Sequence, residues 1–202
     1  MHNCNDRNGH CPPAVLYSKE GKPLLSWRVL LLPQLDEEGL YKQFKLDEPW
    51  DSPHNLGLLP KMPKVYAPPD VRGQSVQPYH TFYQVFVGKG TPFEIKEGPR
   101  IPADFPDGTS NTILIADGGD AVPWTKPADI AYDPDGPLPP LGGAFPEAFI
   151  FSEMKTRRPM CMVALADGSS RPIDLKIVSE HSIRAAITRN GCEKLDYSWT
   201  AY

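Results

Sequence analysis

Proline and glycine interrupt this chain so often that no long helix can form in it. The sequence contains 24 prolines and 16 glycines among 202 residues, about a fifth of the chain, against roughly 12% in average proteins. Proline removes a backbone donor and glycine costs conformational entropy, so both end regular helices. A long-helix bundle and a coiled coil are therefore excluded. Because 40% of the residues are hydrophobic, enough apolar surface remains for a folded core.

The distribution of charge and hydrophobicity excludes two further classes. The net charge is −4, and the only clustered positive charges are Lys155, Arg157 and Arg158, so a nucleic-acid partner is not expected. The longest apolar stretch, residues 29–32, ends at Pro33, whereas a membrane span needs roughly 20 apolar residues. The sequence as written shows no signal peptide or anchor, and we expect no membrane insertion by this chain.

The order of local signals predicts one α+β domain over residues 1–202, with short helices first, antiparallel strands next and one terminal helix. Ser26, Ser52 and Ser179 are expected helix caps. Residues 1–8 fit the end of a helix that stops at Gly9. The predicted helices start at Trp27, with a break near Pro33, at Pro53 and at Glu180, the last one closed by Asn190-Gly191; the predicted strands are 81–87, 112–116, 160–165 and 170–173.

Two further segments carry specific expectations. Asp167-Gly168 separates two apolar runs, which predicts a hairpin between 160–165 and 170–173. Residues 123–147 are so rich in proline and glycine that we expect a long loop with almost no regular structure. The tryptophans, Trp27 and Trp124 among them, are expected to fill the core rather than to line a ligand site.

The cysteines leave three possibilities open. Cys4 and Cys11 flank the Gly9 break, where the chain can fold back, and this predicts a disulfide between them. Free thiols, or a zinc site that also uses His10, are the alternatives. Cys161 lies in an apolar strand and is expected to be a buried thiol.

Few residues suggest chemistry. Oxygen donors gather in one loop, so a calcium site is conceivable, although a turn stabilised by its own side chains explains the same pattern. The calcium candidates are Asp104, Asp107, Thr109, Ser110 and Asn111. Ser152 and Lys155 match the S-x-x-K spacing of a serine–lysine hydrolase, but the other motifs of that class are missing. We therefore predict no catalytic residues, no enzyme activity and no required cofactor.

Several long motifs resemble one family, the prepilin-like proteins of planctomycetes, known as domain of unknown function 1559 and by an H-x9-DG motif. The matching segments are residues 1–13, 25–33, 46–55, Asp107-Gly108-Thr109-Ser110-Asn111-Thr112-Ile113, 121–127, Ala166-Asp167-Gly168-Ser169 and 187–191. The chain differs at two points. Arg157 stands where the family typically has the motif histidine, and the sequence starts at what resembles the end of the family's long apolar N-terminal helix.

The resemblance implies a pilin-like fold, in which an N-terminal helix packs on an antiparallel sheet. It also implies a non-enzymatic, pseudopilin-like role in cell-envelope assembly or type II-like secretion, with other pilin-like or secretion-system proteins as partners. The implied location is the cell envelope, outside the cytoplasm. The alternative is an extracytoplasmic ligand-binding module that uses the proline-rich loop.

Overall fold

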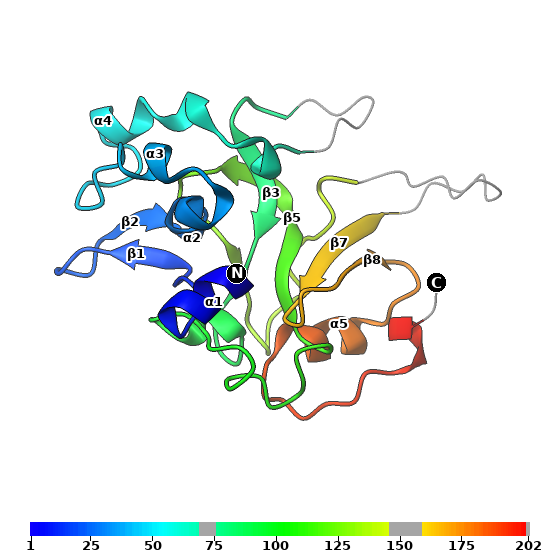
Figure 1. The fold of residues 1–202 in the computed structure, drawn as a ribbon. Coiled ribbons are helices and arrows are strands. Elements are labelled where there is room, and N and C mark those ends of the chain that lie inside the picture. The colour runs from blue at the N-terminus through cyan, green and yellow to red at the C-terminus, as the bar shows by residue number, and fades with distance from the viewer. Residues whose placement is uncertain (69–75, 146–158, 201–202) are drawn as a thin grey trace.

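A computed structural model describes residues 1–68, 76–145 and 159–200, and within these it shows an α+β fold (Figure 1). The α-helices are α1 (His2–Asn8), α2 (Trp27–Leu30), α3 (Glu38–Tyr41), α4 (Pro53–Leu56) and α5 (Glu180–Ile187). The strands are β1 (Val15–Tyr17), β2 (Pro23–Ser26), β3 (His80–Gln84), β4 (Phe86–Val87), β5 (Ile113–Pro123), β6 (Ile130–Ala131), β7 (Met160–Leu165) and β8 (Ser170–Asp174). The short 3₁₀ turns are η1 (Leu32–Leu35), η2 (Leu59–Lys61), η3 (Lys64–Tyr66), η4 (Pro92–Glu94) and η5 (Tyr197–Thr200).

The main sheet is antiparallel, in the order β3-β5-β7-β8. Its β7–β8 hairpin pairs Met160 with Asp174 and Ala164 with Ser170 across the Asp167-Gly168 turn. This confirms the predicted hairpin. Gly168 has a φ of 89°, a conformation that glycine adopts without steric cost.

The predicted caps also form. The hydroxyl oxygens of Ser26, Ser52 and Ser179 accept hydrogen bonds from the backbone N–H groups of Arg28, Asn55 and Ser182. Each cap satisfies a donor that the first helical turn leaves open. The helix that starts at Trp27 breaks after Leu30 into η1, whose first turn contains Pro33, as proline requires.

The end of α5 was predicted incorrectly. Asn190-Gly191 does not close this helix, because Thr188 already has extended backbone angles. Residues 189–192 instead form hydrogen bonds with Asp107, in a distant loop described below, and these long-range bonds determine their conformation.

The strands around the glycines differ from the prediction. The expected strand 81–87 is divided into β3 and β4, and β5 continues past 116 through Gly118 and Gly119. A side chain at Gly118 would come within 2.2 Å of Gln84 Nε2, and one at Gly119 within 2.6 Å of Pro140. Glycine here permits a close approach between backbone segments rather than ending the strand.

The proline-rich segment contains a short strand. Residues 130–131 form β6, which pairs in parallel with β4, and the N–H of Gly119 donates to the carbonyl of Pro140 (2.9 Å). Apart from β6 and the end of β5 at Pro123, the described part of this segment contains no helix or named strand, as the expected long loop with almost no regular structure requires. Backbone pairing with β4 compensates for the poor intrinsic propensity of the segment.

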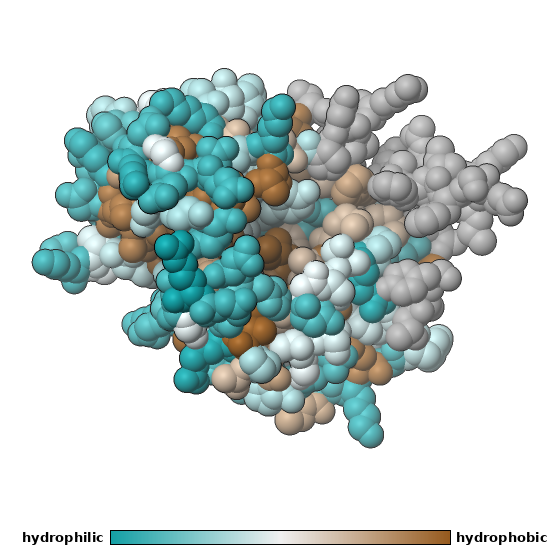
Figure 2. All heavy atoms as spheres, in the orientation of Figure 1, coloured by the Kyte–Doolittle hydropathy of each residue, from teal (hydrophilic) through white to brown (hydrophobic). Residues whose placement is uncertain are grey.

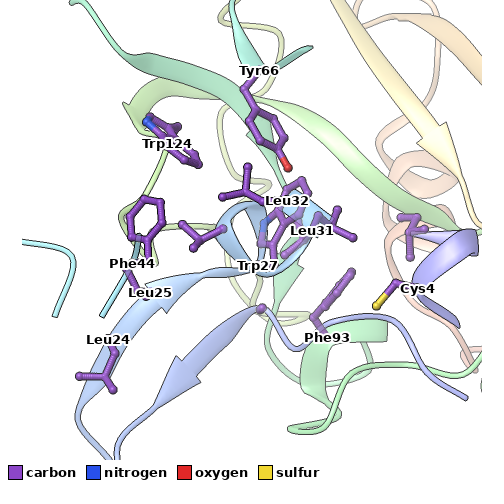
Figure 3. Close-up of a cluster of buried hydrophobic side chains, with 14 of the residues drawn as sticks. Cys4, Leu24, Leu25, Trp27, Leu31, Leu32, Phe44, Tyr66, Phe93 and Trp124 are labelled. Carbon is purple, nitrogen blue, oxygen red and sulfur yellow. The ribbon is translucent and has the colours of Figure 1, made fainter. Parts of the chain in front are cut away.

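Within the described part of the chain, two hydrophobic clusters make up the core. The first lies among the N-terminal elements and contains Trp27, Phe44, Tyr66 and Trp124 (Figure 3). Within it, the rings of Tyr66 and Trp124 stack at 5.9 Å, and Phe44 meets Trp124 edge-on at 5.7 Å. Trp27 and Trp124 are almost completely buried, which confirms their expected place in the core.

The second cluster joins the sheet to α5, below the sheet in Figure 1. It packs Val163 of β7 and Ile173 of β8 against Ile183 and Ile187. On the face shown in Figure 2, hydrophobic residues form separate patches among hydrophilic ones. None of the helices within the described ranges has the length and apolar character needed to cross a membrane.

Candidate functional site

Three of the segments that carry the family resemblance meet at one end of the main sheet. The N–H of Asp107 donates to the carbonyl of Arg189 (3.2 Å), and the N–H of Asp167 donates to the carbonyl of Thr109 (3.0 Å). We call residues 107–112, 166–169 and 189–192 the motif junction. Backbone hydrogen bonds between distant segments hold it together.

Asp107 is the central side chain of the motif junction. Its Oδ2 accepts a hydrogen bond from the N–H of Gly191 (2.8 Å), and its Oδ1 accepts one from the N–H of Cys192 (3.1 Å). Cys192 has a φ of 59°, which is uncommon for a residue with a side chain. Both carboxylate oxygens of Asp107 therefore fix the backbone that follows α5.

Asp167 stabilises the hairpin turn in a similar way. Its Oδ1 accepts hydrogen bonds from the backbone N–H (2.8 Å) and the hydroxyl (2.6 Å) of Ser169. The bond from the Ser169 hydroxyl is the largest cause that lowers the pKa of Asp167. The carboxylate of Asp167 thus closes the turn that Gly168 makes possible.

The calcium candidates are not brought together by the structure. Asp104 forms an ion pair with Arg100 (Oδ1 to Nη2, 2.8 Å), which lowers the pKa of Asp104. Asp107 instead accepts hydrogen bonds from the backbone of residues 191–192. The amide of Asn111 donates to the Asp107 carbonyl (2.8 Å), as in a self-stabilised turn. Within residues 1–68, 76–145 and 159–200, no three histidine, cysteine or acidic side chains are grouped to hold a metal ion.

Helix α1 is seated beside the motif junction. The side chain of Asn5 forms two hydrogen bonds with the backbone of Ile101, one through Oδ1 (2.8 Å) and one through Nδ2 (3.0 Å). A side chain at Gly168 would lie 3.4 Å from Nε2 of His2. Helix α1 ends at Gly9, whose φ of 83° gives the expected left-handed cap.

The expected disulfide is absent, because Cys4 and Cys11 are both free thiols. Both residues are buried, and each has different hydrogen-bond partners. The Cys4 sulfur accepts a hydrogen bond from the Asn8 amide (3.2 Å), and the N–H of Cys11 donates to the carbonyl of Pro99 (2.8 Å). Burial raises the pKa of Cys11 to about 12. Cys161 is a fully buried free thiol, as predicted.

The best-organised polar group is one that the sequence did not single out as a site. Arg28, on α2, is fully buried, yet all five of its side-chain N–H donors have acceptors. Nε donates to the Trp124 carbonyl (2.9 Å) and Nη1 to the Tyr83 carbonyl (2.8 Å). Nη2 donates to the carbonyls of Lys126 (2.9 Å) and Ala128 (3.2 Å).

The fifth donor of Arg28 binds Asp129, forming a buried ion pair at 3.2 Å. The same Oδ1 of Asp129 accepts from the indole N–H of Trp27 (3.0 Å) and the backbone N–H of Val85 (3.0 Å). Burial raises the pKa of Asp129, and Arg28 opposes this shift. We call Arg28, Asp129 and their hydrogen-bond partners the arginine centre.

The arginine centre joins two segments that the family resemblance had already marked, residues 25–33 and 121–127. One signal could have drawn attention to it. Arg28 is the single charge in the apolar run from Leu24 to Leu32, and a charge in such a run must find a partner when it is buried.

A second buried carboxylate lies in the main sheet. Asp117 of β5 is almost completely buried; its Oδ2 accepts from the N–H of Met162 (3.2 Å), while its Oδ1 has no hydrogen-bond partner among the described residues. Burial raises the pKa of Asp117 to about 6. It is not part of either site described above.

Four residues named in the sequence analysis lie outside the described residues: Ser152, Lys155, Arg157 and Arg158. Neither the S-x-x-K spacing nor the position of the missing motif histidine is therefore placed in the fold.

Comparison with known proteins supports the DUF1559 part of the family resemblance. A family model described as a protein of unknown function, DUF1559, matches residues 1–137. The chain belongs to this family. The matched region contains the whole arginine centre and the part of the motif junction around Asp107. No curated protein and no solved structure matches the chain.

Proposed function

We propose that this protein is a non-enzymatic, pseudopilin-like globular domain that acts through protein contacts in cell-envelope assembly or type II-like secretion. Its partners would be other pilin-like or secretion-system proteins, and its location the cell envelope, outside the cytoplasm. The proposal goes beyond the family assignment. Its prepilin-like part rests on the resemblance of the sequence motifs to prepilin-like proteins.

The position of α1 is the main observation in support of the proposal. In pilin-like proteins an N-terminal helix packs against an antiparallel sheet, and here α1 is fastened by Asn5 to Ile101, with His2 beside the β7–β8 turn. The carboxylates of Asp107 and Asp167 are engaged by backbone donors. Asp167 closes the β7–β8 turn beside His2, and Asp107 fixes the backbone that follows α5, so both acids have a structural task.

The ligand-binding alternative relies on residues 123–147 as a recognition loop. Much of this loop is engaged inside the protein, because Trp124 and Thr125 are fully buried and Asp129 pairs with Arg28. Farther along, Arg184 of α5 donates to the carbonyl of Gly136 (2.8 Å). These contacts leave less of the loop to bind a ligand, so they favour the first proposal.

Deletion of the gene in its native cell tests the proposal. We expect specific proteins to fall in the extracellular or envelope fraction while their total amounts are unchanged, and complementation to restore them. Unchanged fractions would overturn the proposal. Purified protein should also be inactive on a panel of fluorogenic hydrolase substrates, and turnover that survives repurification would contradict the non-enzymatic role.

A further inference from the structure

The first observation is that strand β1 has an open edge. Residues in an antiparallel pair alternate between those that bond to the partner strand and those directed away from it. The N–H of Trp27 donates to the carbonyl of Ala14 (3.0 Å), whereas the N–H of Ser26 donates to Thr125, away from β1. Val15 lies opposite Ser26, so the peptide groups of Val15 point away from β2.

The alternation continues along β1 past a register shift in the pairing between Leu16 and Tyr17. The N–H of Ser18 donates to the carbonyl of Lys22 (2.8 Å), which makes Ser18 a bonded position. Tyr17 lies between Leu16 and Ser18, whose peptide groups face β2. Tyr17 itself lies opposite Pro23, which has no N–H to donate. Val15 and Tyr17 therefore present backbone donors and acceptors at the strand spacing that an added strand requires.

A groove of about 740 Å³ runs beside this edge. One wall is formed by Ala14, Val15 and Tyr17, and the other by residues 87–89 and 93–96. No β2 residue lines it within the described ranges, so the groove follows the free edge of β1 and does not cover a face of the hairpin. Phe93 lies on the side of β1 opposite β2 (Figure 3).

The lining of the groove combines apolar and positive groups. Val15, Val87 and Ile95 are half-buried, and Phe93 is buried at its base. Lys89 and Lys96 are exposed on the far wall, while the carboxylate of Glu94 accepts a hydrogen bond from the N–H of Gly90 (3.0 Å). A chain with a net charge of −4 thus has two lysines beside an apolar groove.

We propose that this groove binds an extended segment of a partner protein, in which acidic residues alternate with apolar ones. The segment would add a strand to β1, with its backbone bonded to Val15 and Tyr17. Its apolar side chains would enter the groove and its carboxylates would face Lys89 and Lys96. This inference rests on the proposed function, because it identifies the surface used for protein contact.

A labelled peptide of alternating glutamate and valine is the probe, with binding followed by fluorescence anisotropy. We expect saturable binding, together with slower hydrogen exchange of the Val15 and Tyr17 amides when the peptide is bound. A peptide of alternating lysine and valine should bind on the order of tenfold more weakly. Equal binding of the two peptides would overturn the charge assignment and with it the proposal.

Two variants of the protein sharpen the test. Lys89→Glu with Lys96→Glu should weaken binding about tenfold or more. The matched control, Lys64→Glu with Lys176→Glu, makes the same charge change at exposed positions outside the groove and should bind like wild type. Val15→Pro removes an outward N–H that the hairpin does not use, and it should lower affinity while the circular dichroism spectrum is unchanged.

Some outcomes would assign the groove differently. Light scattering could show a dimer that Val15→Pro disrupts. That result would mean that a second copy of this chain occupies the β1 edge, and it would overturn the proposal that a partner segment binds there. Absence of any peptide binding would also overturn it. The proposed secretion role would still stand if gene deletion changes the envelope fractions, so the failure of one is distinguishable from the failure of the other.

Discussion

The arginine centre and the motif junction both use charged side chains to hold backbone segments together, but in opposite environments. Arg28 and Asp129 are buried, and their side chains are 0% and 2% exposed. Asp107 and Asp167 lie at turns nearer the surface and bind backbone N–H groups. Loss of one partner in the buried ion pair leaves the other charge buried and unsolvated. At a surface turn, water can replace a lost hydrogen bond. The same kind of interaction therefore has different energetic consequences in the two places.

The largest effect is expected from Arg28→Ala. The substitution leaves Asp129 as a buried charge without its partner and removes the donor to the Trp124 carbonyl. We expect the free energy of unfolding to fall by about 3–5 kcal/mol, measured by urea denaturation. Arg100→Ala, which breaks an ion pair whose arginine is 63% exposed, is the control and should have little effect. Similar losses for both variants would contradict the comparison.

The next effect is the pH dependence caused by Asp117. Its pKa rises from 3.8 to about 6 in the folded protein, so folding favours the protonated acid and stability falls as pH rises from about 4 to about 6. Asp117→Asn removes this titration and can still accept from Met162. We expect the variant to be more stable than wild type at pH 7 by up to about 3 kcal/mol, with the difference vanishing near pH 4.

Asp120→Asn is the matched control for that experiment, because Asp120 is an exposed carboxylate on the same strand. Its stability relative to wild type should be nearly the same at pH 4 and pH 7. If wild type and Asp117→Asn show the same pH dependence of stability between pH 4 and pH 7, the carboxylate of Asp117 must have another partner in the folded protein, and the prediction fails.

A smaller effect is expected at the motif junction from Asp107→Ala. This change removes the acceptors for the N–H groups of Gly191 and Cys192, and we expect a loss of about 1–2 kcal/mol. Hydrogen exchange should accelerate at these two amides more than in β7. Asp107→Asn keeps one acceptor and should lie between wild type and the alanine variant; an alanine variant with unchanged exchange at 191–192 would refute the assigned role.

The smallest effect is expected from calcium. Binding would require Asp104 to leave Arg100 and Asp107 to leave residues 191–192. We therefore expect added Ca²⁺ to change Tm by less than about 1 °C, since a ligand stabilises only by its preference for the folded state. A larger rise with Ca²⁺ than with Mg²⁺, lost in Asp104→Ala, would restore the calcium hypothesis.

The parts of the fold that the sequence predicted correctly depend on residues close together in the chain. Each serine cap bonds to an N–H two or three residues later, and the β7–β8 hairpin is determined by the Asp167-Gly168 turn. These signals act within a few residues, so they can be recognised without knowledge of the fold.

The parts that were missed depend on distant partners. Arg28 and Asp129 are separated by 101 positions, and neither residue type indicates which partner it will have. The predicted strand 112–116 stopped short of Gly118 and Gly119, because the close packing of these glycines against Gln84 and Pro140 depends on tertiary structure. For the candidate site, the sequence indicated which loops matter and offered both a self-stabilised turn and a calcium site for residues 104–111. It gave no sign that Asp107 binds the distant backbone of Gly191 and Cys192.

The separation between Arg28 and Asp129 also has a consequence for the order of events during synthesis. At about 5–20 residues per second, the ribosome needs on the order of 5–20 s to make the chain between Arg28 and its last acceptors. During that time Trp27 and the leucines of residues 24–32 cannot complete their packing, because Trp124 and Asp129 do not yet exist. The first hydrophobic cluster can therefore reach its native packing only after residue 129 has been synthesised.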